Sequence, residues 1–372
     1  MKKIFLDVAA GVRANPASLH AAGVKAGREL EAARQLVAET LGAHPDEIIF
    51  TSGGTESNNL AILGLPEGEV IVSSIEHASV LAPAAARGRG VIILPVDSAG
   101  KVKIEKLAEL ITPQTVLVSI ILANNEIGTI QSMAEIAKVV RQARRRLGTV
   151  TPYLHTDACQ AARFIPLDVN KLGVDLLTLN GSKLIGPGTG VLYRRRGIPL
   201  KPLLYGGGQE GSLRPGTENV AGISAFARAL AQAQKSCLKE SKRLIKLRDY
   251  FIKAVKKNIP EAELNGHLSE RLPNNINFSF PGVLGEQVVL ELDAKGIAVS
   301  TGSACAIPKH DDSYVIMALG KDKNHAISAL RFTLSQNTTA ADLNYVLKIL
   351  ISIITKLKKT NHDYSSQFTL WI

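Results

Sequence analysis

The sequence contains few cysteines and no cysteine pattern typical of disulfide or metal sites. Its three cysteines, Cys159, Cys237 and Cys305, are scattered over 372 residues, and no CxxC pair occurs. This excludes a small fold stabilised by a disulfide framework, and no metal site is expected. Scattered thiols suit a reducing compartment, so we expect a cytoplasmic protein.

Long apolar runs are also missing. The opening MKKIFLDVAAG faintly resembles a signal peptide, but its apolar stretch is short and Asp7 interrupts it. No segment reaches the roughly 20 apolar residues of a membrane-spanning helix, so no membrane partner is expected. We predict instead that residues 1–11 form a first β-strand.

Aromatic residues make up only 5% of the chain, whereas the formal net charge is +11. Basic runs at residues 144–146, 194–196 and 235–257 would suit nucleic acid, but they lack interleaved aromatic residues and a recognition motif. A solvated basic surface is the favoured interpretation, and nucleic-acid binding is not expected. Acidic protein partners would be attracted equally well.

Apolar strands and amphipathic helices alternate regularly over residues 11–234. This pattern predicts an α/β fold with a mostly parallel sheet covered by helices. The 45% hydrophobic content is enough to bury a large core. A charged helical run at residues 236–258 then leads to a smaller α+β region. We predict a large domain over residues 12–235 and a small domain over residues 236–372, accompanied by residues 1–11.

Lys183 ends the strand-like run TLNGSK, just before the glycine- and proline-rich turn LIGPGTG. A buried amine at a strand end, beside groups that lower its pKa, is suited to form an imine with an aldehyde cofactor such as pyridoxal phosphate. Many lysines before Gly-Pro merely end an element, and this fragment alone leaves that alternative open.

The turn TSGGTES follows a short β-run at residues 47–50. Gly53 and Gly54 allow backbone N–H groups to approach a ligand closely, Thr55 adds a hydroxyl, and the next helix contributes its positive N-terminal end. The turn therefore predicts a phosphate site. The alternative is a capped strand–helix turn without a ligand, because Thr and Ser are common caps.

Two more polar side chains follow predicted strands, where the ligand sites of α/β sheets collect. His77 could stack on a flat ring and exchange protons near neutral pH, or it could be a surface histidine. Asp157 could keep a pyridine nitrogen protonated, or it could cap the following helix.

These segments belong to an ordered set that covers almost the whole chain: NPASLH, IIFTSGGTESNN, EHASV, LVSIILANNEIGTIQ, HTDACQ, NGSKLIGPGTG, GGGQEGSLRPGTENV, VSTGSACA, SYVIMALG and LRFTLSQNTT. In this set the chain resembles the cysteine desulfurases, fold-type I pyridoxal-phosphate enzymes related to nitrogen-fixation and iron–sulfur-cluster assembly proteins. The resemblance implies a large domain with a mostly parallel sheet of the seven-stranded type and a smaller α+β domain. It also implies pyridoxal 5′-phosphate as cofactor, L-cysteine as substrate and L-alanine as product.

The resemblance further assigns roles to individual residues. Lys183 is implied to bind the cofactor aldehyde and to remove the substrate α-proton, while Arg331 holds the substrate carboxylate. Asn125 is implied to contact the substrate and to lie, with Gln160, near the ring hydroxyl of the cofactor. Thr217 is implied to reach the phosphate of the neighbouring subunit in a homodimer. The residues implied to surround the cofactor are Gly54, Thr55, His77, Asn125, Asp157, Gln160, Asn180, Ser182, Lys183 and Thr217.

Cys305 decides the expected reaction type. It precedes a proline and a run of polar residues typical of a loop, and Lys309 and His310 supply positive charge that lowers a thiol pKa from about 8.5. The resemblance implies that its thiolate takes the substrate sulfur, with His77 managing the substrate thiol proton, and passes it to acceptor proteins. These are an iron–sulfur scaffold or a sulfur carrier, serving cluster assembly or tRNA thiolation. Cys305 is also a candidate to ligate an iron–sulfur cluster transiently.

The chain departs from the family pattern in two places. A helix-sized segment is missing before NPAS, in a region that relatives place over the active-site mouth. Ser182 stands where many relatives have a histidine, so one hydrogen-bond donor remains without a positive charge. Two other interpretations stay open: a selenocysteine lyase or related lyase with the same cofactor, and a non-catalytic cofactor-binding or scaffold protein.

Overall fold

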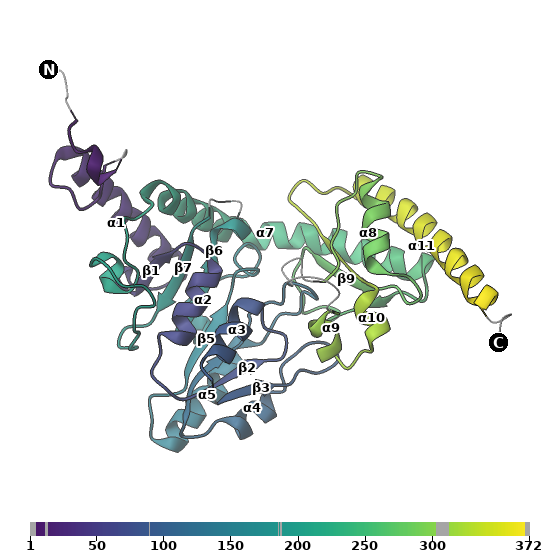
Figure 1. The fold of residues 1–372 in the computed structure, drawn as a ribbon, viewed down its shortest axis with the longest axis horizontal. Coiled ribbons are helices and arrows are strands. Elements are labelled where there is room, and N and C mark those ends of the chain that lie inside the picture. Colours follow the sequence, from purple (N-terminus) through teal and green to yellow (C-terminus); the bar gives the residue numbers. More distant parts are fainter. Residues whose placement is uncertain are drawn as a thin grey trace.

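The computed structural model describes residues 5–11, 14–88, 90–184, 186, 188–302 and 312–368, with residues 361–368 described by their backbone alone. Helices surround a larger and a smaller β-sheet, and the helix α7 (Val220–Asn258) runs from one to the other (Figure 1). Near its start α7 contacts α1 (Ala21–Leu41), and it also packs against α11 (Ala340–Phe368).

Among the described residues, seven strands form the larger sheet in the order β1-β7-β6-β5-β4-β2-β3. The strands are β1 (Ile48–Thr51), β2 (Glu69–Ser73), β3 (Val91–Leu94), β4 (Thr115–Ser119), β5 (Tyr153–Asp157), β6 (Leu176–Asn180) and β7 (Gly190–Arg194). Only β7 runs antiparallel to its neighbours, so the other strands of this sheet end at one common edge. The predicted α/β fold with a mostly parallel sheet is therefore confirmed.

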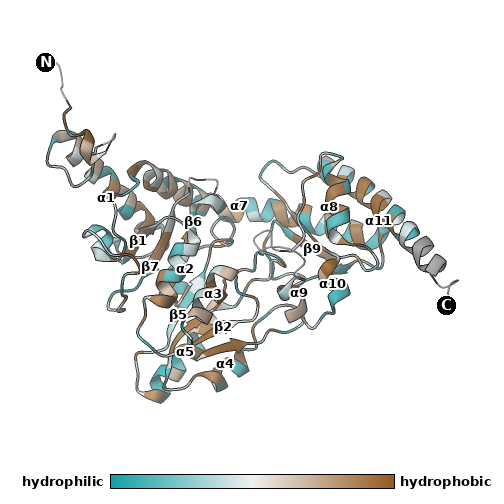
Figure 2. Cartoon of the chain, in the orientation of Figure 1, coloured by the Kyte–Doolittle hydropathy of each residue, from teal (hydrophilic) through white to brown (hydrophobic). Residues whose placement is uncertain are grey.

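The strands of this sheet are apolar because helices cover both of their faces. In β2 all residues after Glu69 are buried, and in β1 every residue is buried. Figure 2 draws β1 and β2 mostly in brown, whereas the surface helices alternate between brown and teal. The remaining helices of this part are α2 (Gly54–Leu63), α3 (Ala78–Ala86), α4 (Ile104–Leu110), α5 (Met133–Leu147) and α6 (Val169–Leu172), with short 3-10 turns η2 (Pro45–Glu47), η3 (Gly181–Leu184) and η4 (Gln209–Ser212).

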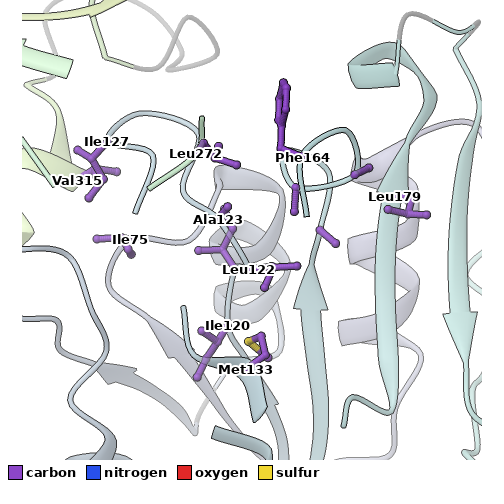
Figure 3. Close-up of a cluster of buried hydrophobic side chains, with 14 of the residues drawn as sticks. Ile75, Ile120, Leu122, Ala123, Ile127, Met133, Phe164, Leu179, Leu272 and Val315 are labelled. Carbon is purple, nitrogen blue, oxygen red and sulfur yellow. The ribbon is translucent and has the colours of Figure 1, made fainter. Parts of the chain in front are cut away.

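The smaller sheet is antiparallel and has the order β10-β9-β8 among the described residues. Its strands are β8 (Glu263–Leu264), β9 (Asn275–Ser279) and β10 (Ala329–Thr333), accompanied by α8 (Gly285–Asp293), α9 (Tyr314–Ala318) and α10 (Lys323–Ile327). Buried apolar side chains from both parts, among them Ile127, Leu272 and Val315, belong to one core cluster (Figure 3). The two sheets thus share one core cluster, while a second cluster, with Ile49, Val72 and Leu192, belongs to the larger sheet alone.

The opening segment differs from its prediction. Its described part forms no strand but a 3-10 turn, η1 (Val8–Ala10). Asp7 is hydrogen-bonded to Ser18 and His20, and the Phe5 ring lies against His20 with centroids 5.5 Å apart. The described part of the segment therefore lies before α1, at the end of the molecule opposite α11 (Figure 1).

Other boundaries differ by smaller amounts. The strand expected at residues 47–50 is β1, shifted by one residue, and the helix expected to open at Glu56 begins at Gly54. The helix α7 begins at Val220, so the predicted domain boundary after residue 235 falls inside one continuous helix. In the described part of the chain, no helix has the length and apolar character needed to cross a bilayer.

Candidate active site

A cavity of about 520 Å³ opens where the larger sheet meets the smaller one. Ten of the residues that the sequence singled out line it: Gly54, Thr55, His77, Asn125, Asp157, Gln160, Asn180, Ser182, Lys183 and Arg331. Most of them follow β1, β2, β4, β5 and β6, the strands whose carboxyl ends share one edge. The topology therefore brings together side chains that lie up to 277 positions apart in the chain.

The turn after β1 presents the beginning of α2 to the cavity. Gly54 is the first residue of α2, and a Cβ atom there would lie 2.9 Å from the Cys159 sulfur and 3.3 Å from Cβ of Asn180. Only glycine fits at this distance, so the backbone of the first helical turn can approach the cavity floor. The first N–H groups of a helix lack intrahelical partners, and together with Thr55 they form an anion-binding end.

Opposite this helix end, Asn180 and Ser182 shape the turn that carries Lys183. Both the backbone N–H and the hydroxyl of Ser182 donate to Oδ1 of Asn180, at 3.1 and 3.0 Å. The Gly181 N–H donates to the Thr189 carbonyl, which closes the turn onto β7. Lys183 itself is exposed, which differs from the buried amine that the sequence predicted, because its side chain stands at the open cavity rather than in the core.

Asp157 and His77 are joined by a chain of hydrogen bonds through two buried side chains. The Asn58 amide donates to Oδ2 of Asp157 and to the Ser79 hydroxyl, each at 2.8 Å. The Ser79 N–H donates to Nδ1 of His77 at 3.1 Å. Since Nδ1 accepts this bond, a neutral His77 carries its proton on Nε2. Asp157 also accepts from the Cys159 N–H at 2.9 Å, so the capping role considered for it is present beside the site role.

A second histidine, which is fully buried, lies on the strand that ends in Asp157. His155 Nδ1 is 2.8 Å from the Ser119 hydroxyl, and its Nε2 is 3.1 Å from the Thr178 hydroxyl. Burial lowers the pKa of His155 to about 4, although the nearby Asp157 acts in the opposite direction. His155 is therefore neutral at physiological pH. Burial, together with Asp157, raises the pKa of the Cys159 thiol, so Cys159 is not a thiolate there.

The smaller sheet supplies the other wall. Arg331 on β10 donates from Nη1 to the Asn125 carbonyl at 3.1 Å, which links this wall to the segment after β4. Asn274, Thr333 and Ser335 line the cavity beside it. Asn274 is 8% exposed, and its Oδ1 is buried without a hydrogen-bond partner in the part of the chain that the structure describes. A buried unpaired amide oxygen is costly, which marks this wall as one with unused hydrogen-bonding capacity.

One predicted site residue, Thr217, does not line the cavity, and another, Cys305, lies outside the described residues. Thr217 is exposed. Its segment is held in place by Glu210, whose carboxylate accepts from Arg34 and from the Phe50 N–H. Cys305, with Lys309 and His310, lies outside the described residues.

Sequence reasoning missed the residues that support the site from behind. Asn58 and Ser79 lie within the motifs IIFTSGGTESNN and EHASV but were given no role there, and Asn274 lies outside every quoted motif. Asn58 follows Gly54 by one helical turn, and that spacing was the available signal. Within the described residues, no three possible metal ligands form a cluster.

Comparisons with known proteins agree with this arrangement. The family described as Aminotransferase class-V matches residues 1–346. The chain is 45% identical to the cysteine desulfurase IscS of Dictyoglomus turgidum over 354 residues, which cover 92% of this chain and 88% of the relative. It is 42% identical to the cysteine desulfurase IscS of Methanosarcina thermophila, covering 92% and 86% of the two chains.

Solved structures give the same result. A NifS-like protein superposes with a TM-score of 0.84 at 36% identity, covering 92% of this chain and 91% of the other. The NifS-like protein from Rickettsia africae superposes with a TM-score of 0.83 at 31% identity, covering 92% of each chain.

Proposed function

The chain belongs to the aminotransferase class-V family and is a cysteine desulfurase, and from this premise we propose how its own residues perform the reaction. The family depends on pyridoxal 5′-phosphate. We propose that this chain binds the cofactor in the 520 Å³ cavity and uses Lys183, His77, Arg331 and Cys305 on L-cysteine. The observation that carries the proposal is the convergence of ten predicted residues on that one cavity.

The cavity fits the cofactor in size and chemistry. Its volume lies within the roughly 300–1,000 Å³ typical of small-molecule sites. The N-terminal end of α2, with Gly54 close to the floor, suits the phosphate, and Asn180 and Ser182 stand beside it. Asp157, fixed by Asn58, suits a protonated ring nitrogen. When bound, the cofactor withdraws electrons from the substrate α-carbon.

The chain's own groups bind the substrate and move its protons. The guanidinium of Arg331 would hold the α-carboxylate with paired hydrogen bonds, with Asn125 beside it. Lys183 would bind the cofactor aldehyde and, once released by the incoming amine, remove the proton from the α-carbon. His77 would exchange the substrate thiol proton through Nε2, because its Nδ1 already accepts from Ser79.

Cys305 would receive the sulfur. Its thiolate attacks the substrate sulfur, an S–S bond forms, and the C–S bond breaks with its electron pair left on carbon, which takes up a proton to give alanine.

Replacing Cys305 by serine tests the proposal. We expect Cys305→Ser to keep the cofactor spectrum and to lose both alanine and persulfide formation, since a hydroxyl is a far weaker nucleophile at neutral pH. The matched control is Cys237→Ser, a buried cysteine in α7. Normal turnover of Cys305→Ser would reject Cys305 as the sulfur acceptor, and a protein that never binds the cofactor would reject the cofactor assignment.

We also propose that the enzyme works as a homodimer in which Thr217 completes the partner's phosphate site. Thr217 is exposed, as are the nearby apolar residues Leu204 (54%) and Tyr205 (88%), which would be covered by a second copy. Dilution should then release cofactor as dimers dissociate, and Thr217→Ala should weaken its retention by about 1.5–3 kcal/mol. Full retention by a monomer in sedimentation runs at low concentration would contradict this.

The remaining parts of the proposal concern the cellular setting and the domains. We propose that sulfur passes from Cys305 to an acceptor protein, either an iron–sulfur scaffold or a sulfur carrier, in the cytoplasm, where a reactive thiol stays reduced. The division into a large domain ending at residue 235 and a small domain beyond it also stays a proposal. Persulfide trapping followed by affinity capture identifies the acceptor.

A further inference from the structure

Glu126 is a buried carboxylic acid that the proposed reaction does not use. It follows Asn125 directly and is 1% exposed. The Ser313 hydroxyl donates to its Oε2 at 2.6 Å. The Glu126 carbonyl accepts from the side-chain amides of Asn275 and Asn277, each at 3.1 Å, so the residue is fixed against the smaller sheet.

The same carboxylate lies next to Gly302. A Cβ atom on Gly302 would be 3.1 Å from Oε2 of Glu126, closer than an ordinary contact. Just before Gly302, Ser300 and Arg331 exchange two backbone hydrogen bonds of 3.2 and 2.7 Å. The residues that lead into the Cys305 segment therefore meet both Glu126 and the strand that carries Arg331.

The residues that lead out of the segment are held at the same place. After Ser313, the Tyr314 hydroxyl donates to the Glu76 carbonyl at 2.5 Å, and Glu76 precedes His77. Val315 and Ile127 both belong to the buried cluster drawn in Figure 3. Gly302 and Ser313 thus approach one carboxylate from opposite sides of a gap of ten residues in the sequence.

We infer that Glu126 is a positioning residue that holds both ends of the Cys305 segment against the substrate wall of the cavity. The inference rests on the proposed role of Cys305. Glu126 touches neither substrate nor cofactor in this scheme. It acts through Ser313 and Gly302, which fix where the thiol-bearing segment leaves and rejoins the fold, beside Asn125 and Arg331.

The anchor does not require a particular charge on Glu126. Burial raises the pKa of this carboxyl, and the Ser313 hydroxyl and the positive Arg331 oppose that rise. A carboxylate and a protonated carboxyl group both offer an oxygen that accepts the Ser313 hydroxyl. A glutamine offers the same acceptor at nearly the same place, so the hydrogen bond can be separated from the charge.

Three variants of the full-length, cofactor-loaded dimer test the inference: Glu126→Ala, Glu126→Gln and Ser313→Ala. We expect Glu126→Ala to slow persulfide formation about 10²-fold, the scale of a misplacement of about 1 Å, with little change in the KM for cysteine and in the cofactor spectrum. Glu126→Gln should restore most of the rate. Ser313→Ala should share the defect, and adding it to Glu126→Ala should slow the reaction no further.

Hydrogen exchange gives a readout that needs no turnover. In Glu126→Ala the amides of residues 312–316 should exchange faster, while those of α8 stay unchanged. The matched control is Glu47→Ala, which removes a 5% exposed carboxylate that accepts from the backbone N–H groups of His44 and Arg196. It should lower the melting temperature and leave the persulfide rate unchanged.

The outcomes separate this inference from the function it rests on. If the unmodified protein forms no persulfide on Cys305, the proposed function fails first. If it does, and Glu126→Ala forms persulfide at the normal rate, the positioning role is wrong. A loss in Glu126→Ala that Glu126→Gln does not rescue, or a KM that rises in proportion to the lost rate, also overturns it. Should Glu126→Ala not fold, Ser313→Ala decides alone.

Discussion

The two walls of the cavity differ in how their polar side chains are satisfied. On the wall formed by the larger sheet, Asp157 accepts from Asn58 and Cys159, and His77 accepts from Ser79. On the wall formed by the smaller sheet, Oδ1 of Asn274, which lines the cavity, is buried without a partner among the described residues; Oδ1 of Asn58 is also unpaired, but Asn58 lies behind the larger sheet's wall and not in the lining. The first wall is preorganised before any ligand arrives, whereas the second retains hydrogen-bonding capacity.

This difference matches two kinds of ligand. A resident cofactor is best held by groups whose orientation is already fixed, because fixing them costs nothing at the moment of binding. A substrate that enters and leaves at each turnover needs groups that its arrival can satisfy. We therefore expect substitutions on the wall formed by the larger sheet to affect cofactor retention or stability. Substitutions on the wall formed by the smaller sheet should affect the KM for cysteine.

The largest expected effect is on the sheet wall at Lys183. Lys183→Ala should abolish covalent attachment of the cofactor and all turnover, because the covalent link depends on this amine. Borohydride reduction followed by peptide mapping measures it. The control Lys171→Ala removes another exposed lysine, 85% exposed, and should retain the label at Lys183. If the label were found on a different lysine, the wall formed by the larger sheet would not be the cofactor site.

His155, which lies behind the wall formed by the larger sheet, should make the stability of the protein depend on pH in the acid range. Its folded pKa is about 4, against about 6.5 when unfolded, so between these values the unfolded chain binds more protons. Stability should therefore rise with pH through this window and fall by about 3 kcal/mol as the pH drops from 6.5 to 4. Urea unfolding at a series of pH values tests this, and His155→Gln should flatten the profile.

His325 is the matched control for that measurement. Hydrogen bonds with Asp322 and Glu263 raise its pKa, so its contribution has the opposite sign. The stabilisation that His325 contributes should be present at low pH and disappear as the pH rises through the pKa of His325 in the folded protein. If His155→Gln leaves the acid limb of the profile unchanged, the loss has another origin.

On the substrate wall, Arg331→Lys should raise the KM for cysteine about 10- to 10²-fold, since a lysine replaces paired hydrogen bonds to a carboxylate by a single point contact worth about 1.5–3 kcal/mol less. Cofactor retention should not change. Arg196→Lys, at an exposed ion pair with Asp46, is the control and should behave as the parent protein does. Loss of cofactor from Arg331→Lys would mean that the walls are not separate in function.

The smallest expected effect is at Asn274. Asn274→Ala should lower kcat/KM for cysteine by about two- to tenfold while the melting temperature stays level or rises, because the substitution removes a buried oxygen whose unpaired state costs about 1–3 kcal/mol. Steady-state kinetics and thermal unfolding on the same samples test the decrease in kcat/KM and the unchanged or higher melting temperature. A lower melting temperature with unchanged kinetics would make Asn274 a packing residue only.

The residues on the wall formed by the larger sheet could be predicted from the sequence much better than the residues that hold them in place. Apolar runs ending in glycine or polar residues marked β1, β5 and β6, and parallel strands bring such ends to one edge. This placed Gly54, Asp157 and Lys183 at one edge, whereas Asn180 came from the family resemblance alone. Asn58, by contrast, reaches Asp157 across 99 positions, and a tertiary contact of that kind leaves no local pattern.

The predictions of a strand in the opening segment and of a buried Lys183 were wrong for related reasons. The run MKKIFLDV has the composition of a strand, but a strand needs a neighbour, and the described residues contact Ser18 and His20 instead. The burial predicted for Lys183 depends on what covers the cavity, which neighbouring sequence does not encode. Propensity predicts what a segment can form, and the available partners decide what it does form.

The helix α7 has a mechanical consequence. Its 39 residues make a rod about 58 Å long, which packs against α1 and η3 beside the larger sheet and against β9 and α11 beside the smaller sheet. Because α7 packs against both parts of the molecule, a tilt at one end of the helix is passed on to the other end. A tilt of α7 by a few degrees would change the spacing between the two parts that it joins, and with it the spacing between Arg331 on β10 and Lys183 in η3.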